Sequence, residues 1–76
     1  MKIYGYSKDE TSNDSLLELE EITLQTNSDV LRKIADFIYK SADLMDKHGR
    51  DFGHEHLRDY LKNDAWNNAD IILLKE

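Results

Sequence analysis

The residue types best suited to chemistry are gathered in one short segment, Phe52 to His56, which reads Phe-Gly-His-Glu-His. In an extended segment, His54 and His56 project to the same side, and two imidazoles placed in this way can ligate a metal ion. The zinc-protease pattern requires two histidines four positions apart on a helix, so the spacing of two excludes that motif. Asp51 and Asp59 are available nearby, but no spacing fixes either one as a third ligand.

A structural role for the same segment is the favoured alternative. His54 and Glu55 can cap a short helix while Phe52 packs in the core beneath it. We therefore predict neither a metal nor a cofactor, and His54 and His56 remain the weak candidates for metal ligation.

The sequence contains no recognisable catalytic motif. Hydrolysis requires a nucleophile beside a base, or paired carboxylates that face a cleft. There is no G-x-S-x-G segment and no glycine-rich phosphate loop. Glu18 and Glu20 share one strand face, but that face lies opposite the apolar Leu17 and Leu19, so both carboxylates should be solvated. We expect a protein that is not an enzyme.

One stretch of the chain is strongly acidic. Between Lys8 and Arg32 there is neither lysine nor arginine. Seven carboxylates fill this stretch: Asp9, Glu10, Asp14, Glu18, Glu20, Glu21 and Asp29. The formal net charge of the whole chain is -6, so the remaining residues nearly balance. Such a local imbalance attracts basic proteins and repels polyanions.

Nucleic-acid binding is rejected on the same ground. Stacking aromatics exist in Tyr4, Tyr6 and Trp66, but ten basic residues are spread thinly against sixteen acidic ones. Neutralisation of phosphates supplies most of the affinity of nucleic-acid-binding proteins, and no basic stripe is present to supply it. Trp66 is interpreted either as a core anchor at the start of the last strand or as an exposed binding hot spot.

The size of the chain predicts one α+β domain over residues 1–76. A chain this short buries only about 60% of its unfolded surface, so its stability alone should be marginal. The absence of cysteine suits a reducing cytoplasm and excludes a thiolate zinc site. No leader-like segment and no apolar run of about 20 residues is visible, so we expect a cytoplasmic protein without membrane contact.

Two strands and a polar loop are predicted in the first third of the chain. Residues 1–7 and 16–26 have strand patterns, and residues 7–15 form the loop between them. In the second strand, the pair Leu17 and Leu19 is out of phase with the pair Ile22 and Leu24. A β-bulge at Glu20-Glu21 would bring all four to one side. The alternative is a strand that is apolar on both faces.

The clearest element is a helix over residues 28–48. Its predicted apolar stripe consists of Leu31, Ile34, Ala35, Ile38, Ala42 and Met45, flanked by Val30, Phe37 and Leu44. Three aspartates each precede a lysine by four residues, the favourable order for helix pairs: Asp29–Lys33, Asp36–Lys40 and Asp43–Lys47. Asn27 or Ser28 can cap the start, and Gly49 suits the end.

The last third contains a short helix within residues 55–62, a turn over 64–68, and a buried strand over 69–75 that is apolar on both faces. The order β-β-α-(short α)-β predicts a three-stranded, mainly antiparallel sheet in strand order 2-1-3, with the long helix across one face. The other face would expose Tyr4 and Tyr6 together with side chains of the last strand, and such a patch typically forms an interface.

Several segments together resemble a known family. They read KIYGY, LLELEEITLQ, LRKIADFIYKSADLM and FGHEHLRD, and the best marker is FGHEH, placed just after the helix. The chain is similar in these to a family of small bacterial proteins that provide immunity in polymorphic-toxin systems. The resemblance implies an α+β inhibitor that binds a cognate toxin and performs no catalysis, and it supplies no catalytic positions.

Charge and resemblance lead to one functional hypothesis, an immunity protein that inhibits a basic toxin. Its predicted partner-binding residues are Glu18, Glu20, Glu21, Asp9, Asp14, Tyr4, Tyr6 and Trp66. The carboxylates would steer the partner, and the aromatic side chains would anchor it. The competing hypothesis is a self-associating structural or scaffold protein, a homodimer formed through the open face of the sheet.

Overall fold

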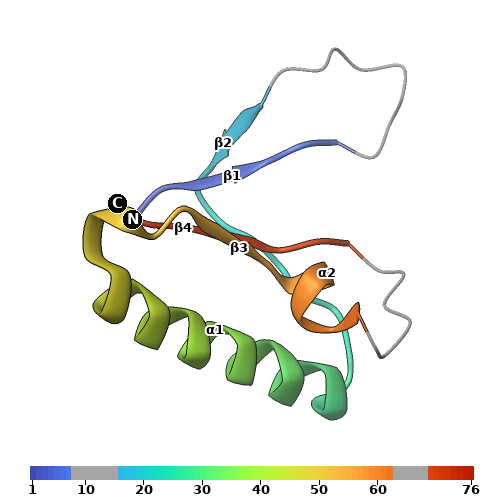
Figure 1. Ribbon diagram of the computed structural model, residues 1–76. Helices are drawn as coiled ribbons and strands as arrows, with labels where there is room; N and C mark the ends of the chain where they lie inside the picture. The colour runs from blue at the N-terminus through green and yellow to red at the C-terminus, as the bar shows by residue number, and fades with distance from the viewer. Residues whose placement is uncertain (8–15, 63–68) are drawn as a thin grey trace.

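The computed structural model describes residues 1–7, 16–62 and 69–76 (Figure 1). In chain order, its elements are β1 (Ile3–Gly5), β2 (Leu17–Leu19), α1 (Ser28–His48), the 3-10 turn η1 (Gly49–Asp51), β3 (His54–His56), α2 (Leu57–Tyr60) and β4 (Ile72–Leu74). The predicted α+β class is confirmed. The described residues exclude positions 8–15 of the predicted loop and the whole predicted turn over 64–68, and with them Asp9, Asp14 and Trp66.

Helix α1 begins and ends where the sequence predicts. At its start, the side chain of Asn27 accepts a hydrogen bond of 3.0 Å from the backbone N–H of Val30. At its end, Gly49 has a φ of 54°, and its N–H donates to the carbonyl of Met45. A side chain rarely adopts this backbone conformation, so glycine is the residue that ends the helix cleanly. Neither α1 nor any other helix in the described part is both long enough and apolar enough to cross a membrane.

The buried face of α1 differs from the predicted stripe. Ile34, Phe37 and Ser41 are the buried residues of the helix. Four members of the predicted stripe are exposed instead: Leu31, Ala35, Ile38 and Ala42. The apolar residues of α1 extend more than halfway round the helix, and only the side that faces β3, α2 and β4 is covered (Figure 1).

The core lies between α1 and the segment that contains β3 and α2. Phe37 and Leu57 are its most buried side chains, with 1% and 0% of their surface exposed. Ile34 and Leu61 complete the buried cluster, against which three partly buried residues pack: Val30, Ile71 and Leu73. Because Leu57 and Leu61 lie one helical turn apart, the short helix α2 presents one continuous apolar edge to α1.

The strands pair two by two rather than in the predicted three-stranded sheet. Among the described residues, β1 pairs with β2 and β3 pairs with β4, both antiparallel. The strand that the sequence does not predict is β3 (His54–His56), a segment whose residues carry no strand pattern and which pairs with β4. The predicted strand order 2-1-3 is therefore not observed. The chain ends lie close together, and the Met1 amino group is 3.8 Å from a carboxylate oxygen of Glu76 (Figure 1).

Two strand predictions are wrong, one in the length of the strand and the other in its burial. Strand β2 ends at Leu19, opposite Ile3 at the start of β1, and the chain bends at Glu20. The predicted strand to residue 26 and its bulge at Glu20-Glu21 are therefore absent, because beyond Leu19 the pairing with β1 has ended. The C-terminal strand is not buried on both faces, since Ile72 and Leu74 are 54% and 68% exposed.

Candidate functional site

The hairpin of β1 and β2 brings two of the predicted partner-binding residues together. Tyr4 and Glu18 are direct partners in the antiparallel register, so their side chains project from the same face. Both are exposed, Tyr4 at 49%. The other face carries Leu17 opposite Gly5 and Leu19 opposite Ile3. Glu18 therefore lies on the face opposite Leu17 and Leu19, as the sequence pattern predicts.

Three further predicted residues lie next to this hairpin in the chain, and all three are exposed. Tyr6 lies just beyond β1 and is 71% exposed. Glu20 and Glu21 follow β2 at the bend of the chain, and both are exposed. We call Tyr4, Tyr6, Glu18, Glu20 and Glu21 the hairpin surface. It combines two aromatic rings with three carboxylates, side chains that can supply apolar contact area and negative charge to an interface.

The two histidines of β3 project together, as the sequence predicts for an extended segment. Their ring centroids lie 4.9 Å apart, with the rings inclined at 68°. The described residues contain no group of three or more His, Cys, Asp or Glu side chains that could hold a metal ion. His54 and His56 therefore form a pair without a third ligand in the part of the chain that the structure describes.

Asp70 binds the end of β3 and the start of α2 through its carboxylate. No sequence pattern marks it as a functional residue. One carboxylate oxygen lies 2.6 Å from Nδ1 of His56, and the other accepts hydrogen bonds from the backbone N–H groups of Arg58 and Ile71, at 2.9 Å and 3.0 Å. Burial raises the pKa of Asp70, but the hydrogen bonds from His56 and the two backbone groups outweigh it, so the pKa lies below its usual value.

The same contacts cap helix α2 from a distance in the sequence. The N–H of Leu57 donates to the carbonyl of Ile71 at 2.8 Å, and the N–H of Arg58 donates to Asp70. These are the first backbone donors of α2, which have no partner inside the helix. The predicted cap by His54 and Glu55 is wrong because His54 and Glu55 lie in β3. The predicted packing of Phe52 is confirmed, since it is buried.

A second group of polar side chains connects α2 to a polar flank of α1. The hydroxyl of Tyr60 donates to the carboxylate of Asp36, and Lys40 lies 3.3 Å from the same oxygen. The Lys40 ammonium also lies 5.6 Å from the centre of the Tyr60 ring. The hydrogen bonds from Tyr60 and Lys40 hold the pKa of Asp36 below its usual value. This group is exposed and connects two helices, so it is a structural contact.

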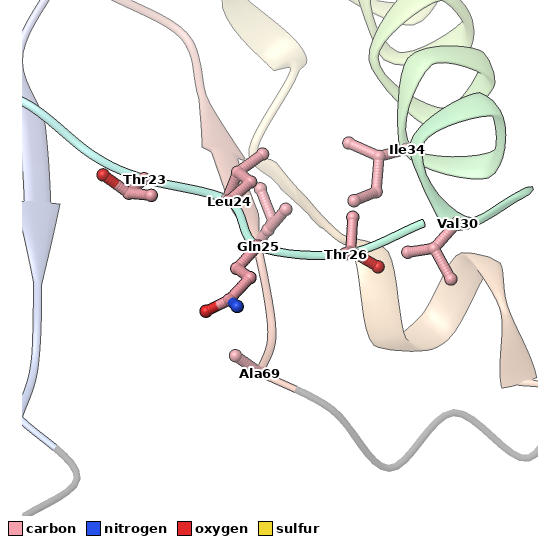
Figure 2. A pocket seen from close by; sticks show the side chains of 8 residues that line it. Thr23, Leu24, Gln25, Thr26, Val30, Ile34 and Ala69 are labelled. Atoms are coloured by element: carbon pink, nitrogen blue, oxygen red, sulfur yellow. The ribbon is translucent and has the colours of Figure 1, made fainter. Parts of the chain in front are cut away.

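A shallow groove of about 230 Å³ lies beside the start of α1 (Figure 2). Its lining consists of Thr23, Leu24, Gln25, Thr26, Val30, Ile34, Ala69 and Ile71. None of these side chains titrates near neutral pH, so the groove offers no acid or base for catalysis. No pattern in the sequence points to this groove, because residues 23–26 fall within the strand predicted over 16–26.

Comparisons of the chain with protein-family models, with curated proteins and with solved structures find no match. Five of the eight predicted partner-binding residues are described, and all five lie exposed on the hairpin surface. The other three, Asp9, Asp14 and Trp66, lie outside the described residues. The hairpin surface is therefore the candidate functional site.

Proposed function

We propose that the protein is a cytoplasmic immunity protein, a non-catalytic module that inhibits a basic toxin through the hairpin surface. The observation that carries the proposal is the register pair Tyr4 and Glu18 on an exposed face, next to Glu20 and Glu21. The segment that contains these carboxylates has no lysine or arginine between Lys8 and Arg32.

The carboxylates of the hairpin surface would act through long-range electrostatic attraction. A cluster of carboxylates attracts a basic partner before contact and raises the rate of association, an effect that salt screens over about 8 Å at physiological ionic strength. Tyr4 and Tyr6 supply apolar area with a polar tip, the type of side chain that dominates interface hot spots. The carboxylates would thus set the association rate, and the two rings would hold the complex together.

The FGHEH segment supports the same proposal through its resemblance to immunity proteins of polymorphic-toxin systems. The small α+β fold is compatible with the inhibitor that this resemblance implies. The segment itself serves the fold, because Phe52 is buried and His56 is held by Asp70. We therefore assign binding to the hairpin surface and structural support to the FGHEH segment.

The test uses a variant with Glu18→Gln, Glu20→Gln and Glu21→Gln. The first step is to look for a basic toxin domain encoded beside the gene of this chain. The measurement is then the rate of association with that domain, by stopped flow at several salt concentrations. We expect the rate at low salt to fall on the order of tenfold and its salt dependence to flatten.

A matched control removes the same number of charges elsewhere: Asp43→Asn, Asp51→Asn and Asp59→Asn. These three residues are exposed and lie outside the hairpin. The control should largely keep the wild-type rate. An unchanged rate and salt slope in the Glu-to-Gln variant would remove the hairpin surface from the mechanism.

Self-association through the sheet is the second candidate function. The observation in its favour is the exposure of Ile72 and Leu74 on β4, two large apolar side chains that no described residue covers fully. In this case the protein would be a homodimeric scaffold. Leu74→Glu should then abolish a dimer detected by light scattering at micromolar concentration.

A further inference from the structure

Helix α1 has two apolar faces, and the described residues bury only one of them. The buried face contains Ile34, Phe37 and Ser41. The second face, which we call the outer stripe, contains Leu31, Ala35, Ile38 and Ala42. Because each residue turns the helix by about 100°, the outer stripe lies about 100° round the axis from the buried face.

The outer stripe has the spacing of a helix-pairing seam. Its residues follow one another at intervals of four, three and four, the pattern that keeps one side of a helix against a partner helix. Leu31 and Ile38 are 45% and 47% exposed, so both retain large apolar surface. Ala35 and Ala42 alternate with them, and small residues at these positions allow two helices to approach closely.

We infer that the outer stripe of α1 binds the same stripe of a second copy of this chain, with the two helices antiparallel. All four residues of the outer stripe are exposed, whereas Tyr60 of α2 contacts the other flank of α1 at Asp36 and Lys40. The inference does not rest on the proposed function, and it places the contact on the helix rather than on the sheet.

The charges beside the stripe determine the orientation of the pair. Arg32 precedes Tyr39 by seven residues and Asp46 follows it by seven, so all three lie along one edge of the stripe. A two-fold axis beside Tyr39 therefore places Arg32 of each copy opposite Asp46 of the other, and the two Tyr39 rings meet. In a parallel pair, the same edge of the two helices lies on opposite sides of the contact, so Arg32 of one copy could not reach Asp46 of the other.

The groups at this edge are available for such contacts. Tyr39 is 72% exposed, the largest exposure among the big apolar and aromatic side chains of α1. Arg32 and Asp46 are exposed too, and neither forms a salt bridge with another residue that the structure describes. The opposite edge of the stripe adjoins the core, so only the Arg32–Tyr39–Asp46 edge can select the orientation.

The size of the contact predicts a weak dimer. Helix α1 has 21 residues and is therefore about 31 Å long. One helix face of this length is smaller than the roughly 800 Å² per partner of a standard interface, so we expect a dissociation constant on the order of 100 μM.

Sedimentation equilibrium of the full chain tests the inference, from about 10 μM to about 1 mM so as to bracket that constant. We expect reversible dimerisation of the wild type. Arg32→Glu and Asp46→Arg should each weaken it at least about fivefold, because each places two like-charged pairs across the axis. The double variant restores opposite charges and should recover most of the wild-type affinity. Lys47→Glu, on the polar side of α1, is the matched control and should change the affinity little.

Exposed positions were chosen so that every variant should fold, which circular dichroism checks. A wild type that stays monomeric up to about 1 mM would overturn the inference, since the expected constant lies well below that concentration. Single charge variants that leave the dimerisation constant unchanged would also overturn it. The same holds for a double variant that dimerises no better than either single variant. A dimer abolished by Leu74→Glu and unaffected by the charge variants would place the contact on β4 instead.

Discussion

Nδ1 of His56 lies 2.6 Å from a carboxylate oxygen of Asp70, a residue fourteen positions further along the chain. The contact fixes the end of β3 to the residue that precedes the last strand. The other oxygen of the same carboxylate holds the first turn of α2 through the N–H of Arg58. One partly buried aspartate thus joins β3, α2 and the start of the last strand.

Replacing this aspartate should destabilise the fold. Asp70→Ala removes the acceptor of three hydrogen bonds, and we expect a loss of about 1–3 kcal/mol. A domain of this size has about 4–11 kcal/mol in total, so the loss should be clear in urea unfolding. Asp43→Ala, at an exposed position of α1, is the control and should stay within about 0.5 kcal/mol of the wild type. Equal midpoints for the two variants would contradict the role of Asp70.

The contribution of Asp70 should depend on pH in a defined direction. Its pKa is lowered in the folded state, so its contribution is complete above the unfolded value of about 4 and is lost as the pH falls through the lowered folded value. Asp70→Asn cannot titrate. The stability difference between the wild type and Asp70→Asn should therefore shrink below about pH 4. Urea midpoints measured across this range give the result, and a difference that grows on acidification would contradict it.

The hydroxyl of Tyr60 should control the acidity of Asp36. The largest cause of the lowered pKa of Asp36 is the hydrogen bond from Tyr60, followed by that from Lys40. Tyr60→Phe removes the first and keeps the ring against Phe37. We expect the pKa of Asp36 to rise toward its usual value, as measured by NMR titration of its carboxyl carbon. The pKa of Asp70 serves as the internal control and should not move.

Leu57 and Leu74 should differ in their contribution to stability because they differ in burial. Leu57 is fully buried, whereas Leu74 is 68% exposed. Leu57→Ala leaves a cavity beneath α1 and should cost about 2–5 kcal/mol, a large part of the total stability. Leu74→Ala should cost less than about 0.5 kcal/mol in dilute solution. Thermal unfolding distinguishes them, and similar melting temperatures would show that the core has been placed wrongly.

Two glycines give a matched test of the end of α1. Neither Gly49 nor Gly53 has any atom within 4 Å of an added Cβ, so space is not the difference between them. Only Gly49 has a positive φ, of 54°. Gly49→Ala should therefore destabilise by about 1–3 kcal/mol through backbone strain alone. Gly53→Ala should be close to neutral in the same denaturant assay, and the opposite order would contradict the assigned helix end.

The local features of α1 could be predicted because neighbouring residues carry them. Asn27 accepts from the backbone three residues ahead, and Gly49 supplies a conformation that few residues tolerate. The exposed face with Glu18 followed from the alternation of side chains along a strand. Glu18 was thus placed correctly on the face opposite Leu17 and Leu19, although its pairing with Tyr4 was not foreseen.

The pairing of strands could not be predicted in the same way. His54–His56 has few strand-forming residues, and it becomes β3 because β4 lies beside it and offers free backbone groups. Asp70 looked like an ordinary polar residue at the start of a strand. Its importance arises from His56 and Arg58, which lie more than ten residues away in sequence.

By itself, the sequence determined the α+β class, the limits of the long helix and the acidity of the segment that contains the hairpin. The tertiary structure alone decided how the strands pair and which half of the wide apolar surface of α1 is buried. The physical reason is that helix caps, charge pairs and side-chain alternation act between residues close in sequence. The burial of a side chain depends on which distant segment packs against it. Ile34 and Ile38 illustrate this, because they lie one turn apart on the same helix, yet only Ile34 is covered by the core.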